Sequence, residues 1–129
     1  MGLDNASSGY GNGIEFSTSA IPWVTSSTAP AAGSPVRFDF SKISRYITIS
    51  NRDATAANTL SIAFTRNGAT GSNKYIVKGG EVVSFEVRVK SVWIQGEGST
   101  PAFSLLAGLT TIDSRHMPML TGSSWDGVG

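Results

Sequence analysis

The 129-residue chain contains no cysteine. Disulfides, thiol catalysis and cysteinyl metal sites are therefore excluded, while the redox compartment stays undetermined. Charged residues make up only 15% of the chain, and its 10 basic and 9 acidic side chains give a formal net charge of +1. Because these charges are spread singly, no basic stripe is available to bind a nucleic-acid backbone. We therefore expect no nucleic-acid partner.

Long apolar runs are also missing. No stretch approaches the ~20 residues that a membrane-spanning helix needs, and the N-terminus has neither the basic nor the apolar region of a secretory signal. We expect a protein that is made in the cytoplasm and does not insert into a membrane.

Motifs of catalysis and metal binding are lacking too. The sequence has no Gly-x-Ser-x-Gly, His-Glu-x-x-His or phosphate-loop motif, and its one histidine, His116, follows the expected strands. The carboxylates are scattered and nowhere spaced like a calcium loop. A glycosidase-type carboxylate pair formed across strands stays an open alternative, because such pairs are spatial. We expect no catalytic residue, no metal and no cofactor.

What the sequence does contain is alternation. Between residues 83 and 90 the apolar residues Val83, Phe85, Val87 and Val89 alternate with polar ones, which is the period of a half-buried strand. Further short alternating runs occupy residues 36–40, 46–50, 60–64, 75–77 and 103–109, separated by turn signals. The pattern slips near Ser91, which predicts a bulge or bend there.

These runs, at spacings of about ten residues and without any helical period, predict an all-β protein with an antiparallel β-sandwich. The pattern does not separate a jelly-roll-like from an immunoglobulin-like topology. We assign residues 36–112 to the sandwich domain, residues 1–35 to an extended N-terminal arm and residues 113–129 to a C-terminal tail. The arm and the tail are rich in small and turn-forming residues.

Both terminal segments nevertheless hold apolar side chains that a solvated linker has no reason to carry. We predict that they dock on neighbouring subunits. The candidate interface residues are Ile14, Phe16, Ile21, Pro22, Trp23, Val24, Met117, Met119, Leu120 and Trp125.

A resemblance adds to this interpretation. The chain resembles the small single-jelly-roll structural proteins of double-stranded DNA virus particles, the penton, minor-capsid and cement class. The segments that carry the resemblance are, in order, IPWVTSS (21–27), FDF (38–40), YITISN (46–51), IAFTRNG (62–68), FEVRV (85–89), AGLT (107–110) and LTGSS (120–124).

The resemblance implies a non-enzymatic capsid protein in the virion, whose partners are other capsid subunits and copies of itself. It also implies that the terminal arms join neighbouring subunits. The chain is shorter than typical jelly-roll pentons and lacks the basic arm of capsid proteins that touch packaged nucleic acid, which favours an outer or inter-capsomer position.

Two alternatives stay open. The chain could be a carbohydrate-binding or host-attachment module, in which case Trp93, expected to face away from Val92 and Ile94, would be an exposed platform for a sugar ring. It could instead be a fibre or appendage subunit that assembles by strand donation from the N-terminal arm.

Overall fold

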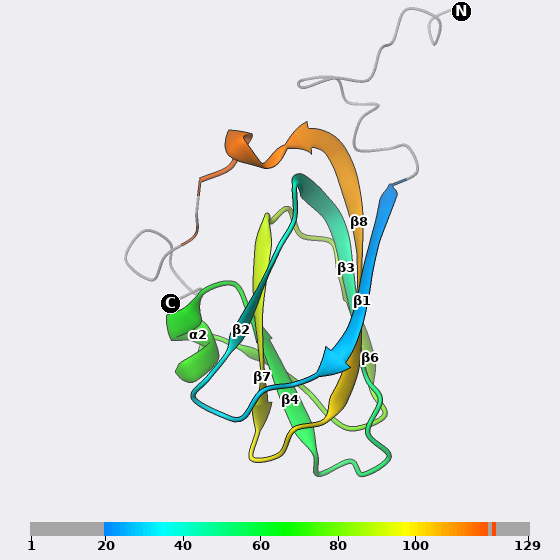
Figure 1. Ribbon diagram of the computed structural model, residues 1–129, viewed down its shortest axis with the longest axis vertical. Coiled ribbons are helices and arrows are strands. Elements are labelled where there is room, and N and C mark those ends of the chain that lie inside the picture. Colours follow the sequence, from blue (N-terminus) through cyan, green and yellow to red (C-terminus); the bar gives the residue numbers. More distant parts are fainter. Residues whose placement is uncertain (1–19, 119, 121–129) are drawn as a thin grey trace, which may run out of the picture.

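The computed structural model describes residues 20–118 and residue 120, and within them the chain forms eight strands and two short helical segments (Figure 1). The strands are β1 (Ile21–Thr28), β2 (Val36–Asp39), β3 (Lys42–Asn51), β4 (Thr59–Ala63), β5 (Tyr75–Val77), β6 (Val82–Phe85), β7 (Ser91–Glu97) and β8 (Ala102–Asp113). The helical segments are α2 (Arg66–Thr70) and the 3-10 helix η2 (Ser114–His116).

The strands form two four-stranded sheets. Sheet A has the order β1-β8-β3-β6 and sheet B the order β2-β7-β4-β5. All strand pairs are antiparallel, and four of them are nested: β1 with β8, β2 with β7, β3 with β6, and β4 with β5. This nesting is that of a long hairpin rolled into two sheets, which is a jelly roll. The predicted β-sandwich is therefore confirmed, and its topology is a jelly roll.

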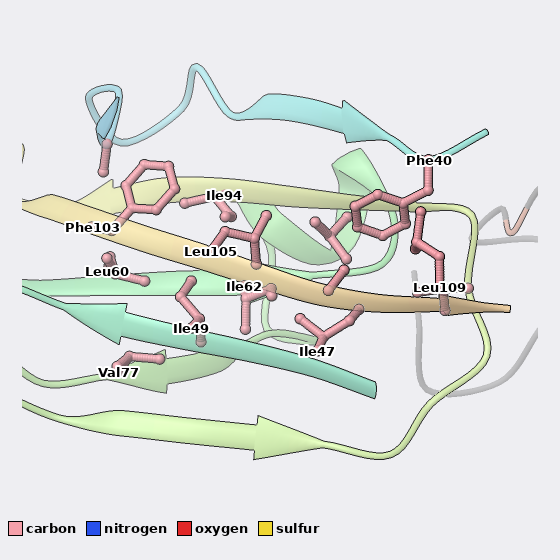
Figure 2. Packing of buried hydrophobic residues seen from close by; sticks show 14 residues of the cluster. Phe40, Ile47, Ile49, Leu60, Ile62, Val77, Ile94, Phe103, Leu105 and Leu109 are labelled. Carbon is pink, nitrogen blue, oxygen red and sulfur yellow. The ribbon is translucent and has the colours of Figure 1, made fainter. Parts of the chain in front are cut away.

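The core lies between the two sheets. Every second residue of the inner strands points into it, as Figure 2 shows for Ile47 and Ile49 of β3 and Leu60 and Ile62 of β4. Other fully or almost fully buried members are Phe40, Val77, Val92, Ile94, Phe103, Leu105, Ala107 and Leu109. The period-2 pattern of the sequence thus produces one continuous apolar layer.

The strand that organises sheet A is β8, which pairs with β1 on one side and with β3 on the other. The alternating run at residues 83–89 behaves differently from the prediction, because β6 ends at Phe85 and the chain then crosses to sheet B. The Ser44 hydroxyl holds this crossing: it donates to the Val87 carbonyl (2.7 Å) and accepts from the Val89 N–H (3.0 Å). The crossing explains the slip in the pattern before Ser91.

The boundary of the N-terminal arm needs a correction. Residues 21–28, which we assigned to the arm, form β1, and all eight pair with β8. At the other end β8 continues to Asp113, one residue into the expected tail. The segment contains strand-favouring Ile, Trp, Val and Thr residues, but Pro22 and the small polar residues beside them give it the composition of an arm.

The short helix α2 was not predicted either. We expected only a turn between the runs 60–64 and 75–77, but Thr65 caps a helical turn by accepting the Gly68 N–H on its hydroxyl at 2.9 Å. The buried Gln95 of β7 fastens this helix to the sheet, because its side-chain amide donates to the Ala69 carbonyl at 2.6 Å. The helix therefore covers part of the outer face of sheet B.

Candidate functional site

The exposed large apolar side chains of the described part share one property: they all lie on edge strands. Ile21 and Val24 belong to β1, Val36 to β2, Tyr75 and Ile76 to β5, and Val82 to β6. Since β1 and β2 end the two sheets on one side and β5 and β6 end them on the other, the sandwich has an apolar β1/β2 edge and an apolar β5/β6 edge. These two edges are the candidate functional site.

At the β1/β2 edge, aromatic rings close the gap between the sheets. The ring of Trp23 in β1 meets those of Phe38 in β2 and Phe40 just after it, with centroid distances of 6.2 and 4.9 Å and edge-to-face geometry. Phe38 in turn stands 5.9 Å from Phe103 of the core. Such edge-to-face pairs add ~0.5–1.5 kcal/mol to the stabilisation from area burial. The interior is therefore sealed here by the chain's own side chains.

The β5/β6 edge is closed in the same way. Tyr75 of β5 and Phe85 of β6 make an edge-to-face pair with centroids 5.2 Å apart. Outside this pair lie Ile76 and Val82, whose exposed fractions are 41% and 62%. At both edges, aromatic side chains of the same chain thus cover the core, and further apolar side chains outside them are exposed to solvent.

Charge is distributed unevenly over the edges. Strands β1 and β6, the two edges of sheet A, contain no charged residue. Strand β2 carries Arg37 and Asp39, and these two form an ion pair with each other at 3.0 Å. Near β5, Lys74 pairs with Glu97 of β7. Charged side chains are a common protection of edge strands against pairing with other chains. Strands β1, β5 and β6 carry none within the strand, and Glu81 and Glu86 flank β6.

The predicted interface residues fall into three groups. Ile21, Pro22 and Val24 are exposed on β1, with Val24 the most exposed at 67%. Trp23 is half-buried against its own core, and so are Met117 and Leu120 beyond β8. Ile14, Phe16, Met119 and Trp125 lie outside the described residues.

Trp23, Met117 and Leu120 thus pack in part on their own chain, and their contact with neighbouring subunits stays a prediction. The C-terminal segment is also held by Lys90, whose ammonium group donates to the Met117 carbonyl at 2.8 Å.

Sequence reasoning missed the whole β5/β6 edge. The available signal was the pair of adjacent valines, Val82 and Val83, after Gly79 and Gly80. In a strand, two adjacent apolar residues point to opposite faces, so one of them must leave the core. Val83 packs on the core and Val82 faces solvent.

Trp93, the candidate sugar platform, points away from the core as expected, since Val92 and Ile94 on either side of it are fully buried. Its ring is half-buried on the outer face of sheet B, and the guanidinium carbon of Arg37 lies 5.8 Å from the ring centroid. The Arg37 side chain of the neighbouring strand therefore covers one face of the Trp93 ring in a cation–π contact.

The pKa of Asp113 is lowered, first because its carboxylate accepts the Arg115 N–H at the start of η2 and then because of nearby positive charges. His116 is exposed on η2. Among residues 20–118 and 120, no group of three or more metal-ligating side chains is found, and no helix is long and apolar enough to span a membrane.

A shallow pocket of about 260 Å³ lies beside β2 and is lined by Arg37, Asp39, Phe40, Lys90 and Ser114. Its charged groups have partners within the chain: Arg37 and Asp39 pair with each other, and Lys90 binds a backbone carbonyl.

Comparisons with known proteins give a distant structural likeness. No family model and no curated protein sequence matches the chain. A solved structure described as Bacillus endospore appendages, a family of disulfide-linked pili, is similar with a TM-score of 0.40 and 21% sequence identity; the match covers 70% of this chain and 89% of that one.

Proposed function

We propose that this protein is a non-enzymatic structural subunit of a virus particle, in which it binds copies of itself and other capsid subunits. The observation that supports this most is the placing of exposed large apolar side chains on the edge strands, at both sides of the sandwich. Contiguous exposed apolar residues typically mark protein interaction sites. A site of this kind needs no catalytic group.

The assignment to a virus particle comes from the resemblance of the sequence to jelly-roll capsid proteins. Jelly rolls with two four-stranded sheets occur in capsid proteins, and also in lectins and cupins, so the fold is compatible with the proposal without selecting it. The terminal segments remain part of the proposal: Ile14, Phe16, Met119 and Trp125 would make contacts with neighbouring subunits in addition to those of the edges.

The energetics favour assembly by many weak contacts. Fully burying one Val, Ile or Leu side chain contributes ~1.5–3 kcal/mol. A contact between the β1/β2 edge of one copy and the β5/β6 edge of another brings together six exposed side chains, each already about half covered. Burying the remaining halves contributes roughly 5–9 kcal/mol of binding free energy. This is similar to the ~4–15 kcal/mol that association costs. A single contact is therefore weak. Stable association then requires several contacts per subunit, as in a capsid or a filament.

A fibre or appendage subunit is the second candidate. The observation in its favour is that the β1/β2 and β5/β6 edges lie on opposite sides of the sandwich, as a repeating contact requires. Donation of a missing strand is not needed for the fold, since β1 to β8 complete a jelly roll within one chain. The carbohydrate-binding alternative has no comparable support, because Arg37 lies over one face of Trp93.

The first experiment measures the molar mass of the purified full chain by sedimentation velocity over a wide concentration range. We expect association that increases with concentration, and we expect Val24→Asp or Val82→Asp to abolish it because each places a charge in an apolar contact. Ala54→Asp, which adds the same charge to an exposed loop residue, is the matched control and should associate like the unchanged chain.

Immunogold electron microscopy of material that contains the native protein then separates the two candidates. Labelled capsids support the virion proposal, and labelled filaments support the appendage instead. A chain that stays monomeric at every concentration would overturn the proposal that it binds copies of itself.

A further inference from the structure

The directions of the strands in sheet A decide how a second copy can be added. In the order β1-β8-β3-β6 each neighbour is antiparallel to the next, so β1 and β6 run in opposite directions. A second copy placed beside the first in the same orientation therefore brings its β1 antiparallel to β6 of the first. An even number of antiparallel strands lets the sheet continue without turning the added copy over.

The two edges of sheet A also match in chemistry. Neither β1 nor β6 has a charged side chain, whereas the sheet B edge β2 carries Arg37 and Asp39. An uncharged edge presents unpaired N–H and C=O groups to any similar strand. A second copy of this chain offers an equally uncharged strand, so its pairing here buries no side-chain charge.

Side-chain parity adds a third point. Trp23 and Val83 pack towards the core, so their neighbours Val24 and Val82 both stand on the outer face of sheet A. If β1 of one copy pairs with β6 of another, these two exposed valines lie on the same face of the continued sheet. There they can form an apolar cross-strand contact, which contributes ~0.2–1 kcal/mol beyond the backbone hydrogen bonds.

We infer that copies of this chain join head to tail through sheet A, with β1 of one copy adding antiparallel to β6 of the next. This inference rests on the proposed self-association and names its interface. The four residues of β6 limit the paired length, and the exposed Val36 of β2 and Ile76 of β5 lie on the same two sides and extend the contact. Because the two patches differ, the contact is heterologous and produces a ring or a filament.

The absence of cysteine makes a direct test simple, because every thiol in a variant is an introduced one. Cysteine is placed on the outer face of β1 (Val24→Cys or Ser26→Cys) and of β6 (Val82→Cys or Ser84→Cys), so that neighbouring registers are sampled. Within one chain these strands are separated by three inter-strand spacings, about 14 Å in total. A disulfide between them can therefore form only between two copies.

The experiment mixes an affinity-tagged β1 variant with an untagged β6 variant, oxidises the mixture and separates it without reductant. We expect a cross-linked heterodimer in at least one β1–β6 pairing, at several times the yield obtained when Ala54→Cys replaces either partner. A chain with cysteine on both strands should give a ladder of multimers.

Three other outcomes would overturn the inference, and they also show whether the proposed structural role fails with it. Disulfides only between two β1 cysteines or two β6 cysteines would mean a two-fold contact. No edge disulfide in a chain that still associates by sedimentation would place the interface elsewhere and leave the proposed structural role intact. A monomeric chain without cross-links would remove both.

Discussion

Truncation of Trp23 tests whether β1 belongs to the sandwich or to an arm that serves a neighbour. In the structure the indole packs on the core of its own chain and meets Phe38 and Phe40 edge to face. Removing a fully buried Trp side chain costs ~3–5 kcal/mol. Trp23 is half-buried, so we expect Trp23→Ala to lower the free energy of unfolding by about 2–3 kcal/mol, including the lost aromatic contacts.

The assay is urea unfolding of dilute, monomeric full chain, followed by circular dichroism at more than one wavelength and fitted by linear extrapolation. Val24→Ala, the adjacent and exposed position on the same strand, is the matched control and should change the unfolding free energy by less than ~0.5 kcal/mol. If Trp23→Ala in dilute monomer were as neutral as the control, β1 would not be part of the folded domain, and the correction of the arm boundary would be wrong.

Three further predictions concern single residues. Gly108→Ala should lower the free energy of unfolding by ~1–3 kcal/mol, because an added Cβ would overlap the Tyr46 ring. In a double-mutant cycle measured by urea unfolding, adding Tyr46→Ala should recover part of this loss. Asn51→Ala should cost ~2–4 kcal/mol, since the buried amide donates to two backbone carbonyls at 2.9 and 3.1 Å; an unchanged unfolding midpoint would refute this. In an NMR titration the pKa of Asp113 should lie below its ordinary value of 3.8, because the carboxylate accepts the Arg115 N–H. The hydrogen bond therefore stabilises the folded chain above pH 3.8, and this stabilisation is lost as the pH falls through the lowered pKa. A titration midpoint above 3.8 would contradict this prediction.

The sequence was sufficient for the fold class because strand alternation reports directly which side chains face the core. Ile47, Ile49, Leu60 and Ile62 all lie in alternating runs, and all are buried as the alternation predicts. The jelly-roll order was not predictable, because strand pairing depends on contacts between residues far apart in the chain.

The boundaries of the sandwich were harder to predict for a related reason. The segment 21–28 contains Pro22 and several small polar residues, which resemble an arm in composition, yet it pairs over its whole length with β8. Its strand-favouring residues Ile21, Trp23 and Val24 are visible in the sequence, but the pairing with β8 that makes it a strand is not. The slip near Ser91 was visible, but its cause, the crossing of the chain from sheet A to sheet B, was not.

The candidate site was predicted in part. Ile21, Pro22 and Val24 were selected as apolar residues in a polar segment, and the structure places them on an exposed edge strand. Tyr75 and Val82 were not selected, because an apolar residue in a strand is normally assigned to the core. The position of β5 and β6 at the ends of their sheets shows that these side chains meet solvent.

Hydrogen exchange of the backbone amides tests the central claim, that the uncharged edges of sheet A join copies of the chain, most directly. Exchange is measured by mass spectrometry on the full chain in dilute and in concentrated solution. The account predicts that peptides covering Ile21–Thr28 and Val82–Phe85 gain protection on association, while the inner strand Ala102–Asp113 keeps the protection it already has. Association that leaves both edge strands as open as in the monomer, with new protection on other surfaces only, would contradict it.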